Sequence, residues 1–343
     1  MNAASRIWTP IDYDVEGKQC DCLRLPFSSD LSAYGFLPIP ISCIKSGPGP
    51  TALLVAGSHG DEYEGQVALN NLIRELDPGD VNGRIIILPA LNFPAVEAGR
   101  RVSPLDDGNL NRLFPGDPLG SPTQMIAHYV SEILIPLADV VVDLHAGGRS
   151  LDYLPSALIR AGRTPEETRS LLELAKVFGA PVSSISDGSG GGGATTLAAT
   201  AQQLNVPAIT AELGGGAALS DKGKDLAEQG VRRVLKRFGI VKDAATQRMS
   251  AVTRLMKVQG RDAFTYAQTN GIFEPAAGVG ETVIEGQLAG KIHPIGWPMR
   301  DVEMIRFKQS GLVACRRVPS LAKPGDCLFK VMADLNADAG VVV

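Results

Sequence analysis

Short apolar runs alternate with helical patterns along the first two thirds of the chain. Five runs rich in Leu, Ile and Val are typical of buried strands: Leu53–Ala56, Arg84–Leu88, Val140–Leu144, Leu154–Ile159 and Val206–Glu212. Three stretches carry apolar residues at helical spacing: Glu64–Glu75, Gln124–Leu137 and Pro165–Phe178. This alternation predicts an α/β fold, with a mixed, largely parallel central sheet and helices on both faces.

The pattern changes after about residue 245, where the helical spacing fades. The segment Gly271–Gly286 contains short apolar runs that Gly and Pro interrupt, as expected of strands joined by turns. We therefore predict two domains, residues 1–245 and residues 246–343, the second a small β-sandwich or barrel. The length of 343 residues agrees with two domains, since one domain commonly takes about 150 residues.

Charge and cysteine content narrow the class of protein. The chain has 33 basic and 37 acidic residues, a net charge of −4, so a nucleic-acid partner is not expected. It contains no run of about 18 apolar residues, and its first residues lack the apolar core of a secretion signal. Five cysteines are an odd and sparse set, which favours a reducing compartment. We expect a cytoplasmic protein without a membrane span.

Two of the four histidines lie at the ends of predicted strands, where α/β sheets place their active sites. His59 follows the first strand and has Glu62 three residues on, while His145 ends the third strand, 83 residues after Glu62. A close pair with one distant ligand is a common layout of zinc enzymes, and it leaves a fourth position for water. We predict a metal site here. A helix N-terminus with acids near its dipole is the alternative for His59 and Glu62 alone.

Other polar residues follow the predicted strands. Glu212 ends the fifth strand, where apolar surroundings would raise its pKa and suit it to proton transfer; an exposed turn residue is the alternative. The loop over residues 92–116 is rich in Arg and Asn, and arginine binds carboxylates or a developing oxyanion, although a solvated surface loop would look alike. The segment Gly190–Gly193 predicts a loop or lid, since it lacks the lysine of a phosphate-binding loop. We expect His128 and His293 to be structural.

Four motifs together resemble the succinylglutamate desuccinylase/aspartoacylase family of the zinc carboxypeptidase superfamily. They are Gly57-Ser-His-Gly-Asp-Glu62, Asn111-Arg-Leu-Phe-Pro-Gly116, Asp143-Leu-His145 and Ala211-Glu-Leu-Gly214. The resemblance covers residues 40–240 in order, and the later β-rich part is similar to the C-terminal domain of that family. It implies a zinc carboxypeptidase-like hydrolase domain over residues 1–245.

The resemblance also implies roles for individual residues. His59, Glu62 and His145 would hold one Zn²⁺ per chain, and Glu212 would act as the general base and then as the general acid. Arg101 would polarise the scissile carbonyl, with its neighbour Arg100 as the alternative. The pair Asn111 and Arg112 would bind the carboxylate of the substrate.

The function implied by the resemblance is a zinc-dependent amidohydrolase that releases an acyl group from a small N-acyl amino acid. The stretch Arg101-Val-Ser-Pro-Leu-Asp106 and the chain length are similar to bacterial members acting on N-acetyl-diaminobutyrate. Two alternatives stay open: a metallocarboxypeptidase acting on peptides, and a non-catalytic binding protein with a degenerate site. We expect the β-rich part to be structural or to exclude long peptides, because it lacks the Met-Lys-Met of a lipoyl carrier. A homo-oligomer is compatible with the sequence, which does not set the oligomeric state.

Overall fold

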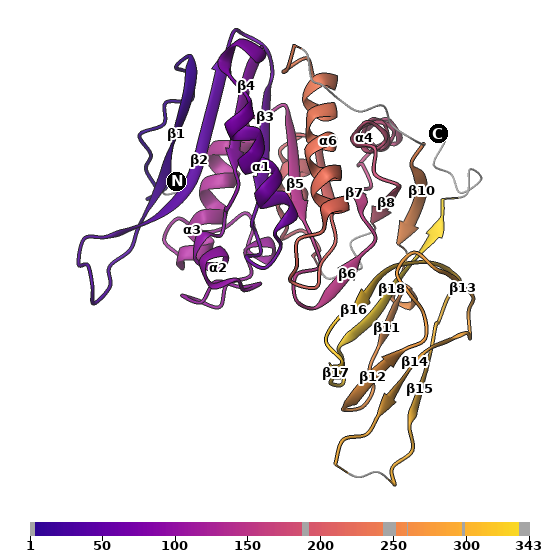
Figure 1. The fold of residues 1–343 in the computed structure, drawn as a ribbon. Helices are drawn as coiled ribbons and strands as arrows, with labels where there is room; N and C mark the ends of the chain where they lie inside the picture. Colours follow the sequence, from indigo (N-terminus) through magenta and orange to yellow (C-terminus); the bar gives the residue numbers. More distant parts are fainter. Residues whose placement is uncertain (1–3, 187–191, 243–251, 259, 297–298, 336–343) are drawn as a thin grey trace.

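The computed structural model describes residues 4–186, 192–242, 252–258, 260–296 and 299–335 (Figure 1). The predicted boundary between residues 245 and 246 lies outside these ranges, and so do Gly190 and Gly191 of the predicted glycine loop. No helix in the described ranges is long and apolar enough to cross a membrane.

A mixed sheet runs through the molecule. Its first strands are β1 (Gly17–Pro26), β2 (Phe36–Ser46), β3 (Thr51–Ala56), β4 (Gly83–Leu88), β5 (Val140–His145), β7 (Ser156–Arg160), β8 (Val182–Ser186) and β9 (Ala208–Glu212), in the order β1-β2-β4-β3-β5-β9-β7-β8. The pairs β4–β3, β3–β5, β5–β9 and β7–β8 are parallel. Antiparallel pairs are β1–β2, β2–β4 and β7–β9. The prediction of a mixed, largely parallel sheet is confirmed.

Helices cover both faces of this sheet, as the sequence predicts. On β3, Leu54 packs with the cluster that includes α1 (Glu64–Glu75), α4 (Pro165–Phe178) and α6 (Asp221–Arg237), whereas Leu53 packs with α3 (Pro122–Tyr129) and α5 (Leu197–Gln203). The alternation follows from the pleat of a strand, which turns successive side chains to opposite faces. A short helix, α2 (Phe93–Ala98), follows β4.

Some elements differ from their predictions. The helix predicted over residues 124–137 is α-helical only to Tyr129 and then continues as a π turn (Val130–Leu134) and a 3₁₀ turn (Ile135–Leu137). Pro136 in the last turn cannot donate the hydrogen bond of a regular helix. The hairpin β1–β2 was not predicted, because β1 is only partly buried and carries no continuous apolar run. The helix α6 was also missed.

The β-rich C-terminal part is a two-sheet sandwich joined to the main sheet. The main sheet continues from β8 through β10 (Arg254–Val258), β18 (Cys327–Asp334), β16 (Gly311–Arg317) and β13 (Thr282–Val283), with β11 (Phe264–Tyr266) beside β18 and β6 (Leu151–Tyr153) beside β16. The second sheet has the order β15 (Glu303–Arg306), β14 (Leu288–His293), β12 (Gly271–Pro275) and β17 (Leu321–Ala322). Phe273, Phe307 and Phe329 pack between the sheets. The predicted small β-sandwich is confirmed.

Candidate metal centre and active site

The loop between β3 and α1 carries His59 and Glu62. Gly60 lies between them with its backbone against α2, and a Cβ at this position would lie 1.9 Å from the carbonyl oxygen of Ala95. The amide of Gly60 also donates a hydrogen bond to the carbonyl of Arg100, at 2.8 Å. Glycine is the one residue that permits this close approach. The loop can therefore pack against α2, and both His59 and Glu62 are buried.

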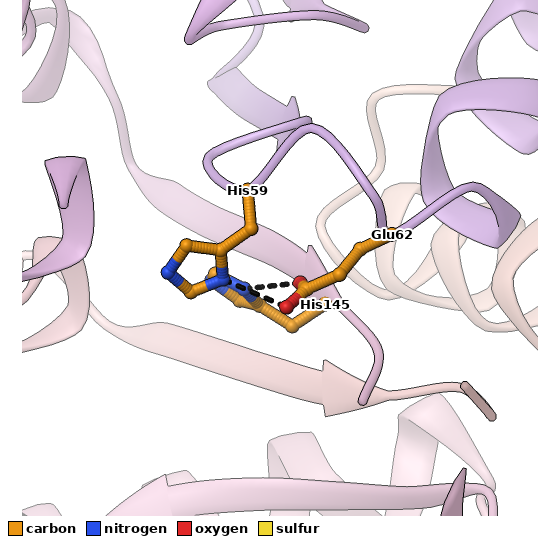
Figure 2. A group of neighbouring side chains, drawn as sticks. All are labelled: His59, Glu62 and His145. Atoms are coloured by element: carbon orange, nitrogen blue, oxygen red, sulfur yellow. Dashed lines mark hydrogen bonds and ion pairs between the residues drawn. The ribbon is translucent and has the colours of Figure 1, made fainter. Parts of the chain in front are cut away.

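His145 reaches the same point from the neighbouring strand. It is the last residue of β5, which runs parallel to β3, so the carboxyl ends of the two strands meet. The Nδ1 atom of His145 lies 2.9 Å from Glu62 Oε2, and that of His59 lies 2.7 Å from Glu62 Oε1 (Figure 2). One ligand atom from each of the three residues lies within 4.8 Å of the others. The structure therefore assembles the predicted triad.

The donor set and its charges fit a divalent cation. Burial alone would raise the pKa of Glu62, but His59 and His145 hold it well below its usual range, so Glu62 is ionised. Burial opposes a charge on His145, yet Asp143 and Glu62 raise its pKa, which shows the negative potential at this point. Two imidazoles and one carboxylate are the ligands of a common class of catalytic zinc site. The three residues form a metal-ligand triad of the zinc type.

The outer nitrogen of each histidine also has a polar neighbour. The Nε2 atom of His145 lies 3.0 Å from Asp143 Oδ2, and that of His59 lies 3.0 Å from Asn109 Oδ1. Neither Asp143 nor Asn109 has a role of its own in the predictions from sequence. Asp143 stands two residues before His145 on a strand, and this spacing, which puts both on one face, was a usable signal. Asn109 belongs to an irregular loop, where no such periodicity exists.

A cavity of about 530 Å³ opens onto the triad. All seven predicted site residues line it: His59, Glu62, Arg101, Asn111, Arg112, His145 and Glu212. The C-terminal part also contributes lining residues, namely Val258, Phe264, Tyr266, Cys327 and Lys330. The sequence did not identify these residues, because their approach depends on how β18 and β10 join the main sheet.

Glu212 lies at the end of β9, directly across from His145 on β5. Its Oε2 atom is buried and has no hydrogen-bond partner in the described part of the chain. Burial raises the pKa of Glu212 to about 7. A carboxyl group with a pKa near neutrality can both accept and return a proton at physiological pH.

Of the two adjacent arginines, Arg101 faces the triad. Its Nη1 atom lies 3.4 Å from Glu62 Oε1 and 3.3 Å from His59 Nδ1. Arg100 instead lies 3.8 Å from Asp107 Oδ1 and does not line the cavity. The side chain of Arg101 is 43% exposed, so its guanidinium can reach a molecule in the cavity.

Asn111 and Arg112 occupy a 3₁₀ turn (Leu110–Arg112) beside the triad. The Oδ1 atom of Asn111 accepts the N–H of Leu197 at 2.9 Å, and its Nδ2 atom lies 3.1 Å from His145 Nε2. Arg112 donates one hydrogen bond to the carbonyl of Asn111. A guanidinium has five N–H donors, so Arg112 keeps donors for a carboxylate in the cavity. A substrate contact of Asn111 stays a prediction.

Comparison with known proteins agrees with this geometry. Residues 48–238 match the succinylglutamate desuccinylase/aspartoacylase catalytic domain. The chain is 38% identical over 337 residues to N-alpha-acetyl-L-2,4-diaminobutyric acid deacetylase from Halomonas elongata, covering 98% of this chain and 97% of that protein.

Two solved structures are similar over nearly their whole length. One is the succinylglutamate desuccinylase/aspartoacylase from Rhodobacter sphaeroides, with a TM-score of 0.91 and 37% identity over 97% of this chain and 100% of that chain. The other is the product-bound ectoine utilization protein EutE (DoeB) from Ruegeria pomeroyi. It has a TM-score of 0.91 and 37% identity, covering 96% of this chain and 100% of that chain. This chain therefore belongs to the succinylglutamate desuccinylase/aspartoacylase family of deacylases.

Proposed function

We propose that this protein is a zinc-dependent deacylase that removes the acetyl group from N-α-acetyl-2,4-diaminobutyrate. One observation carries the chemistry: the triad of His59, Glu62 and His145 lines the same cavity as Glu212, whose Oε2 atom has no hydrogen-bond partner in the described part of the chain. The choice of substrate is supported by the 38% identity to the Halomonas elongata deacetylase over almost the whole chain. We keep the cytoplasm as the proposed compartment, on the cysteine content of the sequence.

The metal would be one Zn²⁺ per chain, held by Nδ1 of His59, Nδ1 of His145 and the carboxylate of Glu62. When bound, Zn²⁺ lowers the pKa of water and polarises a carbonyl group. Co²⁺ or Mn²⁺ could use the same ligands, and metal analysis of the purified protein distinguishes them.

Three residues around the triad would transfer the proton, polarise the carbonyl group and bind the substrate carboxylate. Glu212 would remove a proton from the attacking water and then deliver it to the amine, which leaves only poorly as an unprotonated anion. Arg101 would donate to the oxygen of the scissile carbonyl as negative charge develops there. Arg112 would bind the substrate carboxylate through two N–H groups, which orients the amide toward Glu212.

The size of the cavity supports a small substrate. Its volume of about 530 Å³ lies within the range of about 300–1,000 Å³ that is usual for small-molecule sites. Lys330 and Tyr266 of the C-terminal sandwich are part of its wall. We propose that this wall restricts access by long peptides.

A substrate panel tests the proposal. We expect the zinc-loaded protein to release acetate from N-α-acetyl-2,4-diaminobutyrate faster than from N-acetyl-aspartate. We expect N-succinyl-glutamate, and the C-terminal peptide bond of a longer peptide, to stay essentially uncleaved. The products are measured as free acid and free amine. Preferential cleavage of the peptide would favour the carboxypeptidase alternative. Binding of all substrates without turnover would favour the binding protein.

A further inference from the structure

The two histidines of the triad present the same ring nitrogen to the cluster. In both His59 and His145 the Nδ1 atom lies within 3 Å of an oxygen of Glu62 (Figure 2). A nitrogen that binds a cation must offer its lone pair, so the proton of the neutral ring then belongs to Nε2. Both histidines are nearly fully buried. Each Nε2–H therefore needs an acceptor from the protein.

The acceptors differ in charge. His145 has the carboxylate of Asp143 at 3.0 Å, whereas His59 has the amide oxygen of Asn109 at 3.0 Å. Asp143 follows the usual pairing of a metal-binding histidine with a carboxylate. Asn109 is a neutral acceptor, and it is the partner of His59 Nε2 in the described part of the chain.

The backbone around Asn109 is fixed independently of the histidine. The carbonyl of Asn109 accepts the N–H of Arg112 at 2.9 Å, and the carbonyl of Gly108 accepts that of Ser103 at 3.0 Å. Asp106 binds both the amide of Gly108 and the hydroxyl of Thr123. The backbone that carries Asn109 is therefore held independently of His59 and of any ion.

We propose that Asn109 is a positioning residue of the metal centre, which holds His59 in the tautomer and ring orientation that turn Nδ1 toward the ion. This inference rests on the metal ion of the proposed function but not on the identity of the substrate. The acceptor of His59 is a neutral amide, whereas that of His145 is a carboxylate. A carboxylate partner strengthens an imidazole as a metal ligand, so Asn109→Asp should strengthen the site.

The test measures metal affinity. Asn109→Leu keeps the approximate size of the side chain but removes the acceptor, and we expect the dissociation constant for Zn²⁺ to rise by about 10–100-fold, the usual effect of losing such a partner. Asn109→Asp restores an acceptor, and we expect it to bind at least as tightly as the wild type. The affinities are obtained by competition with a chromogenic chelator. Asn70→Leu, on α1 and outside the lining of the cavity, is the matched control.

Two further readouts separate positioning from folding. The melting temperature of the metal-free variants reports whether Asn109→Leu damages the fold, and ¹⁵N NMR of the zinc-loaded wild type reports which nitrogen of His59 carries the proton. We expect the proton on Nε2. Wild-type affinity in Asn109→Leu, an equal loss in Asn109→Asp, or a proton on Nδ1 would overturn this inference alone. Failure of the wild type to bind zinc would overturn the proposed metal centre as well.

Discussion

Replacing Glu212 by glutamine is expected to lower kcat by about 10²–10⁴-fold, the range that general acid–base catalysis contributes. The glutamine has nearly the same shape but can neither accept the proton of water nor return it to the amine. Because Glu212 is not part of the triad, the bound zinc should stay at the wild-type amount. Acetate release and metal content are measured on the same samples.

The pH profile gives this prediction a second readout. A general base works when ionised, so kcat/KM of the wild type should fall as the pH falls through the pKa of Glu212. Burial places that pKa at about 7, and the charge of a bound metal ion would move it lower. Glu212→Gln should lose this acidic limb.

Glu64 provides the matched control for Glu212. Burial also raises its pKa to about 7, but it does not line the cavity, and one of its oxygens accepts the N–H of Ser220. Glu64→Gln keeps that acceptor, so kcat should stay near the wild-type value. If Glu212→Gln were as active as Glu64→Gln, the proton transfer would have to be assigned to another group.

Replacing His145 by alanine is expected to remove the metal and the activity together. The substitution deletes one of three protein ligands, so zinc affinity should fall by more than the about 10–100-fold that the loss of an outer partner costs. It also leaves the ionised Glu62 beside a single imidazole. Metal content is measured after dialysis, and activity is measured with and without added zinc.

His128 is the control for the loss of a buried histidine. It lies in α3, is buried and does not line the cavity. The His128→Gln variant should keep its zinc, even if the substitution disturbs the packing of α3 and lowers the melting temperature. Full metal content and activity in His145→Ala would contradict the triad, because two ligands cannot reproduce a three-ligand site.

The ends of β3, β5 and β9 show how far sequence reasoning reaches. Each is a short, mostly apolar strand. β5 and β9 end in His145 and Glu212, and His59 follows three residues after the end of β3. Adjacent parallel strands bring these ends together at one edge of the sheet. His145 and Glu212 are therefore predictable as neighbours once the strands are recognised. Glu62 follows because it lies three residues from His59. The local pattern contains the information in each case.

Other parts of the site depend on contacts that no local pattern encodes. Asn109 reaches His59 from an irregular loop 50 residues away. Lys330 reaches the cavity because β18 pairs with β10, which in turn pairs with β8 of the main sheet. The choice between Arg100 and Arg101 depends on which side chain the loop turns toward the cavity. These positions follow from tertiary structure, which periodicity does not determine.

Anomalous diffraction at the zinc absorption edge tests the central claim most directly. Crystals of the zinc-loaded protein should show one strong peak per chain, bounded by Nδ1 of His59, the carboxylate of Glu62 and Nδ1 of His145, with Glu212 across the same cavity. A peak at another place in the molecule, or none at the triad, would contradict the metal centre and the deacylase mechanism built on it.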